Sequence, residues 1–423
     1  MDKQDLDNYT RVPLVSLPDS IAAWHEDVPW VPGVSDTDSP GKPNGNAYDE
    51  TVLSDDCGDI EKLSQLEKLK IRVINGKIKE NLSYGELKLL GCSSLGFVTD
   101  DVRRVLWPKL LRIDDEKTLD TSELSDVHKK IANSVYEQIL KDVTRSGGHL
   151  PPDSTEEDYE IFHRKLTQII CGVLHRHPEL NYYQGYNDVA ATVLIVMGLE
   201  KGLLVLEKIT VEYLERFMEQ TMEKVNQELF YIFALLERIH PALLQHLENV
   251  ELFPHFALAE YTTWYAHKYA ENRKLLHRLF DFFLGTPTLM PLYLSTVIVA
   301  HRDIEIFNTT PDMGHTHKIL CTLPDDLPFE ELLIKAKNLY RDYPPESINA
   351  DVKDFDQKRR CKEREWKQKA EANRIERERL RRLKVAVPQP RIPYRLRSYR
   401  TITVVTIIAI GLYAFLKTGS GLN

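Results

Sequence analysis

The sequence lacks the short motifs that mark most nucleotide-binding, metal-binding and hydrolytic sites. No GxxxxGK[ST] is present, which excludes a phosphate-cradling loop of the P-loop type. HExxH, CxxC and GxSxG are absent as well. The pairs His175/His177 and His315/His317 are spaced two apart, so a helix would point the two members of each pair in different directions. These absences argue against a nucleotide, zinc or nucleophile site in the chain itself.

Cysteine is scarce, with 5 residues among 423 and no clustering. An odd, scattered set in a chain of this length indicates reduced thiols in a reducing compartment, and neither a disulfide framework nor a zinc site. The first ten residues are acidic and polar, so no secretory signal is expected.

Strand signals are missing too, because no stretch alternates apolar and polar residues between turn signals. Apolar residues recur at helical spacing instead, and a hydrophobic fraction of 42% supports a sizeable core. The segment 59–80 reads as an amphipathic helix, with a coiled coil as the weaker alternative because fewer than three heptads are available. The fold class is therefore all-α, a single multi-helix domain. Further helices are expected at 84–92, from Thr99 or Asp100 to Pro108, and at 123–146, 160–176, 189–199, 203–217, 227–240, 243–247, 258–269, 274–284, 290–301 and 329–341.

Acidic and basic residues are divided unevenly along the chain. Residues 358–400 hold 17 Lys and Arg against 5 Glu, whereas residues 1–356 hold 37 basic against 59 acidic residues. Such asymmetry is typical of a tail with a partner of its own. Residues 1–58 are rich in proline, aspartate and serine without a period, which predicts a disordered acidic lead. Trp24 and Trp30 within it are either incidental or part of a short docking motif.

One predicted helix ends in a pattern that suits phosphate chemistry. Ile139, Asp142 and Arg145 are spaced three apart, so they share a face of that helix. Gly147 and Gly148 follow, and glycine in a left-handed conformation is a usual helix stop. Asp142 can hold the guanidinium of Arg145, whose planar fork suits carboxylate on one side and phosphate on the other.

A second stretch, about forty residues later, supplies a glutamine. Tyr182-Tyr-Gln184-Gly-Tyr-Asn187 follows Pro178 and precedes an apolar helix, so Gln184 lies on a loop that enters a helix. An arginine that neutralises phosphate charge and a glutamine that orients water are the two parts that an incomplete GTPase site lacks. Tyr182 is expected to support this loop by packing, and Asn187 by hydrogen bonding to backbone near the arginine.

These stretches resemble the IxxDxxR and YxQ signatures of the TBC domain, which is found in Rab GTPase-activating proteins. A third signature, RxxxW, is present as Arg103-Arg-Val-Leu-Trp107. We interpret Arg103 and Trp107 as a structural cation–π pair. The family pattern Arg-x-Trp-Asp corresponds to Arg278-Leu-Phe280-Asp281, with phenylalanine in the place of tryptophan.

The resemblance covers roughly residues 80 to 345 and implies an activator of an enzyme, not an enzyme. It implies that Arg145 neutralises charge on the GTP of a Rab, that Asp142 fixes the rotamer of Arg145, and that Gln184 holds the attacking water. No cofactor or metal need bind this chain, because magnesium travels with the GTP of the partner. The expected partner is a GTP-loaded Rab, and no nucleic acid.

The end of the sequence reads as a membrane anchor. Residues 401–416 carry no charge and span roughly 24 Å as a helix. With Lys417 snorkelling and Thr418 added, the span reaches about 27 Å, the thickness of the endoplasmic reticulum bilayer. Four arginines in 391–400 precede it, the pattern that keeps the preceding chain cytosolic. The alternative for residues 401–416 is a buried core helix.

Residues 357–384 predict a charged helical spacer, and nucleic-acid binding is the alternative interpretation of this segment.

Four segments follow from these patterns. They are a disordered lead (1–58), a TBC domain (59–345), a basic spacer and linker (346–400) and a tail anchor (401–418). The family's tail-anchored endoplasmic reticulum member is the nearest resemblance, and it implies a Rab of ER-to-Golgi traffic or of lipid droplets. The alternatives are a non-catalytic scaffold that binds a Rab or tethers membranes, and an anchored all-helical adaptor.

Overall fold

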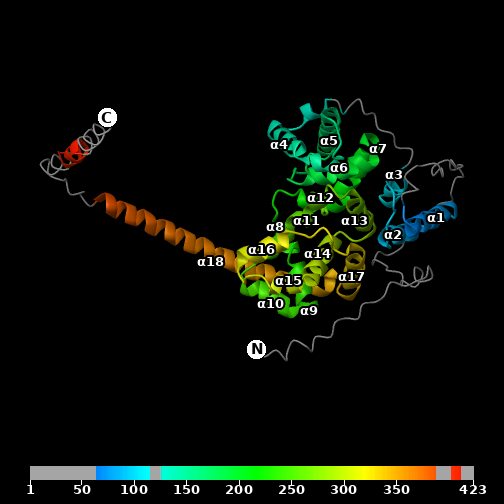
Figure 1. Ribbon diagram of the computed structural model, residues 1–423. Coiled ribbons are helices and arrows are strands. Elements are labelled where there is room, and N and C mark those ends of the chain that lie inside the picture. Colours follow the sequence, from blue (N-terminus) through cyan, green and yellow to red (C-terminus); the bar gives the residue numbers. More distant parts are fainter. Residues whose placement is uncertain (1–62, 115–123, 125, 387–401, 411–423) are drawn as a thin grey trace, which may run out of the picture. The chain divides into compact units, whose positions relative to one another are not determined.

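Helices make up the regular structure of the described residues, and no strand occurs among them, as the sequence predicted (Figure 1). The computed structural model describes residues 63–114, 124, 126–386 and 402–410. The predicted lead at 1–58, with Trp24 and Trp30, lies outside them. The chain divides after Gln357 into two units, and each is described by itself.

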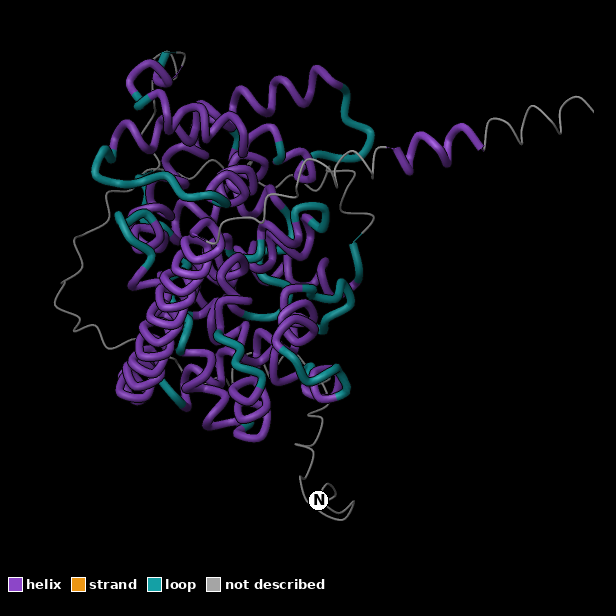
Figure 2. The backbone as a smooth tube through the Cα atoms, turned by 90° about the vertical axis from the view of Figure 1, so that its left-hand side faces the viewer, coloured by secondary structure: helices purple, strands orange, loops and turns teal. Residues whose placement is uncertain are grey.

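The first half of unit 1 leads up to the segment that carries the predicted site. Its helices are α1 (Gln65–Lys79), α2 (Tyr84–Cys92), α3 (Asp100–Leu110), the 3₁₀ turn η4 (Val127–Lys130), α4 (Asn133–Thr144), the 3₁₀ turn η5 (Ser146–His149), α5 (Glu156–Arg176), α6 (Tyr186–Met197) and α7 (Leu199–Ile209). A π-turn η6 (Thr210–Leu214) and a 3₁₀ turn η7 (Glu215–Phe217) continue α7. Figure 2 shows these helices in purple, joined by teal loops.

The second half of unit 1 consists mostly of short helices around one apolar helix. They are α8 (Glu223–Glu228), α9 (Tyr231–Ile239), α10 (Pro241–Asn249), the 3₁₀ turn η8 (Pro254–Ala257), α11 (Leu258–Thr263), α12 (Ala266–Tyr269), α13 (Arg273–Gly285), α14 (Met290–His301), α15 (Asp303–Phe307), α16 (Met313–Cys321) and α17 (Phe329–Asp342). The helix α18 (Pro345–Ala386) begins in unit 1 and runs into unit 2.

Helix starts follow local rules that the sequence displays. Ser64 and Glu67 form a reciprocal capping box at α1, and Ser83 and Glu86 form another at α2. A third box begins α5. Each box pairs two of the backbone N–H groups that the first turn of a helix leaves without partners, so these helix starts are set by sequence neighbours.

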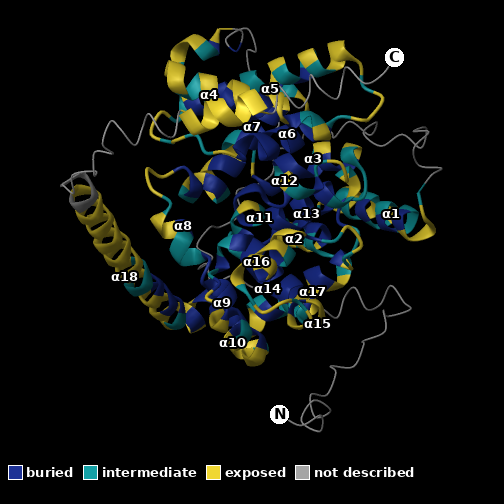
Figure 3. Ribbon diagram, turned by 60° about the vertical axis from the view of Figure 1, so that its left-hand side comes forward, coloured by how far each residue is buried: buried dark blue, intermediate teal, exposed yellow. Residues whose placement is uncertain are grey.

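Two helices, α6 and α14, lie in the core of unit 1 (Figure 3). In α6, eleven of the twelve residues are buried, as the all-round apolar sequence of this segment predicted. α6 packs against α5 and α7, and α14 packs against α9 and α17. The residue that precedes α6 is Gly185, at the end of the glutamine loop, so this loop is attached directly to a core helix.

The segment Arg278–Asp281 of α13 holds the corner between α2 and α3. The Arg278 guanidinium donates to Gly91 O (3.1 Å) and Ser93 O (3.0 Å), which are carbonyls at the end of α2. Asp281 Oδ2 accepts the backbone N–H of Phe97 at 3.0 Å. The cationic side chain of Arg278 thus pairs with backbone carbonyls of this corner, and the anionic side chain of Asp281 pairs with a backbone N–H of the same corner.

The interpretation of Arg103 and Trp107 as a cation–π pair is wrong, because both side chains bind one buried carboxylate. Arg103 Nη2 lies 2.8 Å from Asp281 Oδ2, and Trp107 Nε1 donates to Asp281 Oδ1 at 2.8 Å. The Trp107 ring stacks on Phe280, with centroids 5.9 Å apart. A Cβ atom at Gly96 would lie 2.5 Å from Asp281 Oδ2, and Gly96 has a φ of +54°, so the corner requires glycine there.

Several boundaries differ from the sequence-based expectations. The segment expected as one helix at 258–269 is broken, because Trp264 and Tyr265 both have positive φ (51° and 65°). The expected helix 123–146 starts only at Asn133, after a 3₁₀ turn. α3 continues past Pro108 to Leu110, and α15 and α16 had no predicted counterpart.

The helix α18 is longer than the predicted spacer helix 357–384. It begins at Pro345, where a proline is tolerated because the first N–H has no partner in the helix. Ile348, Val352 and Phe355 in its first turns are buried in unit 1.

Residues 402–410 are helical and exposed, while 401 and 411–418 of the predicted anchor lie outside the described residues. No helix in the described part of the chain has the length and apolar character needed to cross a membrane.

Candidate functional site

The end of α4 carries the arginine singled out by the sequence. Arg145 is the C-cap residue of α4, and the chain continues directly into the 3₁₀ turn η5. The expected left-handed glycine stop is not used, because neither Gly147 nor Gly148 has a positive φ. The side chain of Arg145 is 63% exposed. Ile139, on the same face six residues earlier, is fully buried and fixes α4 to the core.

A buried carboxylate holds this arginine. Asp142, whose side chain is 1% exposed, accepts a hydrogen bond from Arg145 Nη2 through Oδ1. The Gln138 amide also donates to Asp142, at 3.1 and 3.2 Å. The Tyr182 hydroxyl donates to Asp142 Oδ2 at 3.0 Å, so Tyr182 contributes a hydrogen bond in addition to the packing that we expected. Burial, together with the charge of Asp142, raises the pKa of Tyr182, so its hydroxyl stays protonated and donates.

The glutamine loop is tied to the same helix end through Asn187. Asn187 Nδ2 donates to Ser146 Oγ at 2.9 Å and lies 3.5 Å from Asp142 O. Asn187 Oδ1 accepts the backbone N–H of Gly185 at 3.1 Å. Gly185 has a φ of +102°, and a Cβ atom there would lie 2.8 Å from a methyl group of Thr263. Glycine is therefore needed both for the turn and for the close approach of α11.

Gln184 itself is exposed, and its amide forms no hydrogen bond with other described residues. Its neighbours are fixed on both sides. The Tyr183 hydroxyl donates to Thr262 O at 2.7 Å, and Gly185 is held by Asn187. A rigid loop thus presents an amide side chain whose own hydrogen-bonding groups remain available. Arg103 and Trp107 belong to the separate cluster around Asp281.

Three polar residues beside this loop carried no signal in the sequence. Asp188 follows Asn187 and is 8% exposed. Its Oδ2 lies 3.0 Å from Nδ1 of His267 in α12, and its Oδ1 lies 3.7 Å from Nε2 of His149 in η5. Burial disfavours the charged form of Asp188, but the two imidazoles outweigh it, so the pKa of Asp188 is lowered. These residues are far apart in sequence, and no local spacing joins them.

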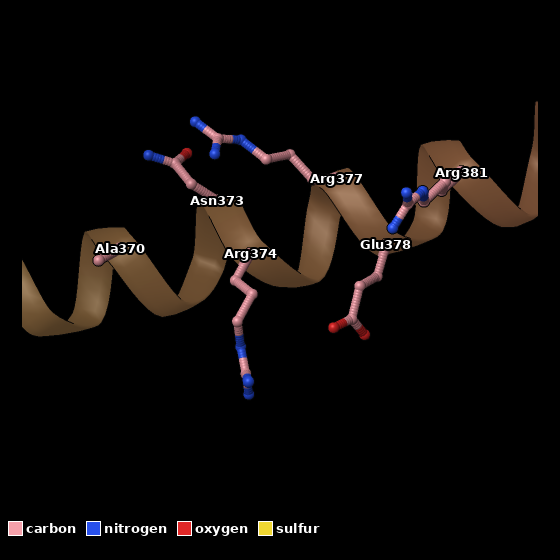
Figure 4. Close-up of a pocket in the computed structure, with 6 residues that line it drawn as sticks. All are labelled: Ala370, Asn373, Arg374, Arg377, Glu378 and Arg381. Atoms are coloured by element: carbon pink, nitrogen blue, oxygen red, sulfur yellow. The ribbon is translucent and has the colours of Figure 1, made fainter.

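A hollow along α18 does not provide a competing site. Its walls are side chains of a single helix, and Figure 4 shows Arg374 and Arg377 pointing to opposite sides of it. Arg374 forms an exposed ion pair with Glu371 (2.8 Å), a contact of small energy. No group of His, Cys, Asp or Glu in the described part of the chain could hold a metal ion.

Comparisons with known proteins agree with this arrangement. The sequence matches the Rab-GTPase-TBC domain family over residues 100–306, a range that includes α4, the glutamine loop and α12. It is 34% identical to TBC1 domain family member 20 of Mus musculus over 285 residues, which are 66% of this chain and 69% of that protein. The chain belongs to the TBC family. Its TBC domain is what holds Arg145 and Gln184 on adjoining segments.

Other relatives extend the comparison. The TBC protein of Bos taurus with the same name is 35% identical over 262 residues, and the chain spans 64% of its length. GTPase-activating protein gyp10 of Schizosaccharomyces pombe is 26% identical over 286 residues, 64% of this chain and 71% of that protein. The Ypt/Rab-GAP domain of Gyp1p has a crystal structure that superposes with a TM-score of 0.52 at 16% identity. This superposition covers 66% of this chain and 99% of the crystallised domain, and it supports the fold alone.

Proposed function

We propose that this TBC protein is a GTPase-activating protein that stimulates GTP hydrolysis by a Rab. One observation carries the proposal. An exposed arginine, held by the buried Asp142, and an exposed glutamine on a rigid loop stand on two segments that are hydrogen-bonded to each other. The name of the gyp10 relative, GTPase-activating protein, supports the same reading.

GTP hydrolysis requires two functions that the side chains of Arg145 and Gln184 can supply. In phosphoryl transfer to water, the charge on the transferring group must be neutralised and the attacking water must be held in line. Arg145 would supply the first function and Gln184 the second, on GTP bound by the partner. Asp142 keeps the guanidinium pre-positioned, so the order that catalysis needs already exists in the free protein. No cofactor of this chain enters the reaction.

Gln184→Ala should lower the stimulated rate about 10²-fold or more, because a single positioned hydrogen-bonding group contributes on this scale. The fold should be unaffected, since the side chain is exposed and forms no hydrogen bond with other described residues. A panel of GTP-loaded Rabs, assayed for phosphate release, provides the measurement. Gln245→Ala, at an exposed position of α10, is the matched control.

Two outcomes of this assay would decide against catalysis. If Gln184→Ala stimulates a Rab as well as the unchanged chain, glutamine does not hold the water. If the unchanged chain binds a Rab without accelerating hydrolysis, the protein is a non-catalytic scaffold.

We further propose that the tail anchors the protein in the endoplasmic reticulum membrane, where it would act on a Rab of ER-to-Golgi traffic. Six apolar side chains of 402–410 are more than half exposed, and apolar surface of this extent is costly in water. The basic residues of 358–400 would lie against an anionic leaflet at about 1 kcal/mol for each one that reaches it. Placing activator and Rab on one surface raises their effective concentration.

Deleting residues 401–423 should release the protein into the soluble fraction, because the apolar run would be gone. The measurement is alkaline extraction of membranes, followed by detection in pellet and supernatant. Deleting the acidic lead 1–58 serves as the control and should leave membrane recovery unchanged. Pellet recovery of the tail-deleted chain after extraction would refute the anchor.

A further inference from the structure

An imidazole stands beside the proposed site and belongs to none of the motifs. His267 lies in α12, directly after the turn formed by Trp264 and Tyr265. Its backbone N–H lies 3.4 Å from Thr263 Oγ1, and the Thr263 methyl group lies 2.8 Å from where a Cβ atom on Gly185 of the glutamine loop would be. The turn that carries His267 thus packs against the loop that carries Gln184.

A chain of hydrogen bonds joins this imidazole to the end of α4. His267 Nδ1 is 3.0 Å from Asp188 Oδ2, and Asn187 Nδ2 donates to Asp188 Oδ1 at 2.9 Å. The same Asn187 amide donates to Ser146, the residue after Arg145. His267 is therefore held in a fixed relation to the arginine by buried groups of α6.

The conformation of this turn supports a functional role. Trp264 and Tyr265 are both 1% exposed and both have positive φ, which costs free energy for residues with side chains. The Tyr265 hydroxyl lies 2.8 Å from Ser295 Oγ, so packing and a buried hydrogen bond hold the turn in place. Unusual backbone of this kind gathers where a protein must aim a side chain.

The outer part of the ring faces solvent. The His267 side chain is 71% exposed, and its Nε2 forms no hydrogen bond with other described residues. The hydrogen bond to Asp188 uses only Nδ1 of the ring, and it does not require the rest of the ring to be exposed near the positive charge of Arg145. Because Nδ1 is hydrogen-bonded to a carboxylate, the orientation of the ring is fixed, and the Nε2–H group can donate to an anion of a bound partner.

We propose that His267 is a third side chain of the site, a cation that contacts an anionic group of the GTP-loaded Rab beside Arg145. This inference rests on the proposed function and deepens it. The anionic group is either a phosphate oxygen of the nucleotide or an acidic side chain of the Rab. Both are recognised by the same charged N–H donor.

Three charged or titratable groups act on the imidazole, and a fourth acts on one of these three. Asp188 of α6 lies against it and has His149 of η5 on its other side, Glu260 of α11 is nearby, and Arg145 opposes its charge. The hydrogen bond to Asp188 outweighs burial and Arg145, so the pKa of His267 is raised above its usual value. The charged form therefore exists below this raised pKa and is lost as pH rises through it. Burial raises the pKa of Glu260 to about 7, so the charge of Glu260 also changes within the pH range of the test.

The test is the pH profile of stimulated hydrolysis for the full chain with a responsive Rab, between about pH 6 and about pH 9. His267→Gln should lose roughly tenfold in rate at the acidic end and little at the alkaline end, since one charge-assisted hydrogen bond is removed. His267→Arg should stay active and lose the pH dependence. A fall in kcat alone would place the contact on the nucleotide phosphate, and a rise in KM alone would place it on an acidic side chain of the Rab.

Two controls separate this role from a structural one. His315→Gln removes another exposed histidine whose Nδ1 bonds an aspartate (2.6 Å to Asp312) and should leave the profile unchanged. Glu260→Gln removes the other group that titrates near neutrality and should retain the dependence on His267. If His267→Gln gives a profile parallel to that of the unchanged chain, the inference is overturned. If the unchanged chain stimulates no Rab, the proposed function fails, and this inference with it.

Discussion

Replacing Arg145 by alanine should remove nearly all stimulated GTP hydrolysis while leaving the fold intact. An arginine supplied in trans to GTP contributes roughly 10³–10⁵ in rate, which is about 4–7 kcal/mol of barrier. The guanidinium carries a permanent positive charge and can neutralise charge on the transferring phosphoryl at any pH of the assay. Its loss should therefore act on kcat and leave the affinity for the Rab largely unchanged.

The fold should survive because Asp142 keeps other donors. After removal of Arg145, the Gln138 amide and the Tyr182 hydroxyl still donate to the buried carboxylate. Arg145 itself is mostly exposed, so little apolar surface is lost. The expected cost in folding free energy is about 1 kcal/mol, the scale of a partly exposed ion pair.

The measurement is single-turnover hydrolysis by a responsive Rab, together with thermal unfolding of both chains. Arg145→Lys retains a charge but not the planar fork, so most of the rate should still be lost. Arg341→Ala is the matched control, because Arg341 of α17 is similarly exposed (60%) and its one ion pair among the described residues is with its neighbour Asp342. Stimulation retained by Arg145→Ala in a folded chain would remove the arginine from the mechanism.

Local spacing predicts the parts of the site that lie within one helix turn or one loop. Asp142 and Arg145 are three residues apart, and this spacing alone brings their side chains together. The apolar run after Asn187 likewise predicts a buried helix that carries the loop. Such features depend on helix geometry, which the sequence shows directly.

The remaining contacts depend on tertiary packing. Asp188 and His267 are 79 residues apart, and no periodicity connects them. Trp264 and Tyr265 are large aromatic residues, for which positive φ is unfavourable, so the break between α11 and α12 had no sequence signal. Arg103 and Trp107 were correctly placed on one helix, but their shared partner, Asp281, comes from α13. Recognising a pair from its spacing does not reveal a third residue that arrives from elsewhere.

The second large effect is expected at that shared partner. Asp281→Ala should destabilise the protein by about 3–5 kcal/mol, because it leaves the buried Arg103 guanidinium without its main counter-ion. Asp281 is fully buried and accepts hydrogen bonds on both oxygens. Oδ1 accepts from Trp107 and Arg103, and Oδ2 accepts from Arg103 and the backbone N–H of Phe97. Since folded domains are stable by roughly 5–15 kcal/mol, this loss is a large share of the total.

Asparagine should not rescue this position, although it has nearly the same shape. Both carboxylate oxygens face donors, so one of them replaced by an NH₂ group would point a donor at a donor. We therefore expect Asp281→Asn to be close to Asp281→Ala in stability. Replacing both charged partners, as Arg103→Met with Asp281→Leu, should be less harmful than either single change, because no uncompensated charge remains buried.

Urea denaturation followed by tryptophan fluorescence measures these differences, and an unchanged m-value would show that the same folded state is compared. Asp325→Ala is the control, since Asp325 is 86% exposed and its ion pair with Lys268 should contribute under about 1 kcal/mol. A cost at Asp281 no greater than at Asp325 would show that Asp100 (2.8 Å from Arg103) suffices as the counter-ion. In that case the corner between α2 and α3 would depend more on Arg278, and Arg278→Ala should then carry the larger effect.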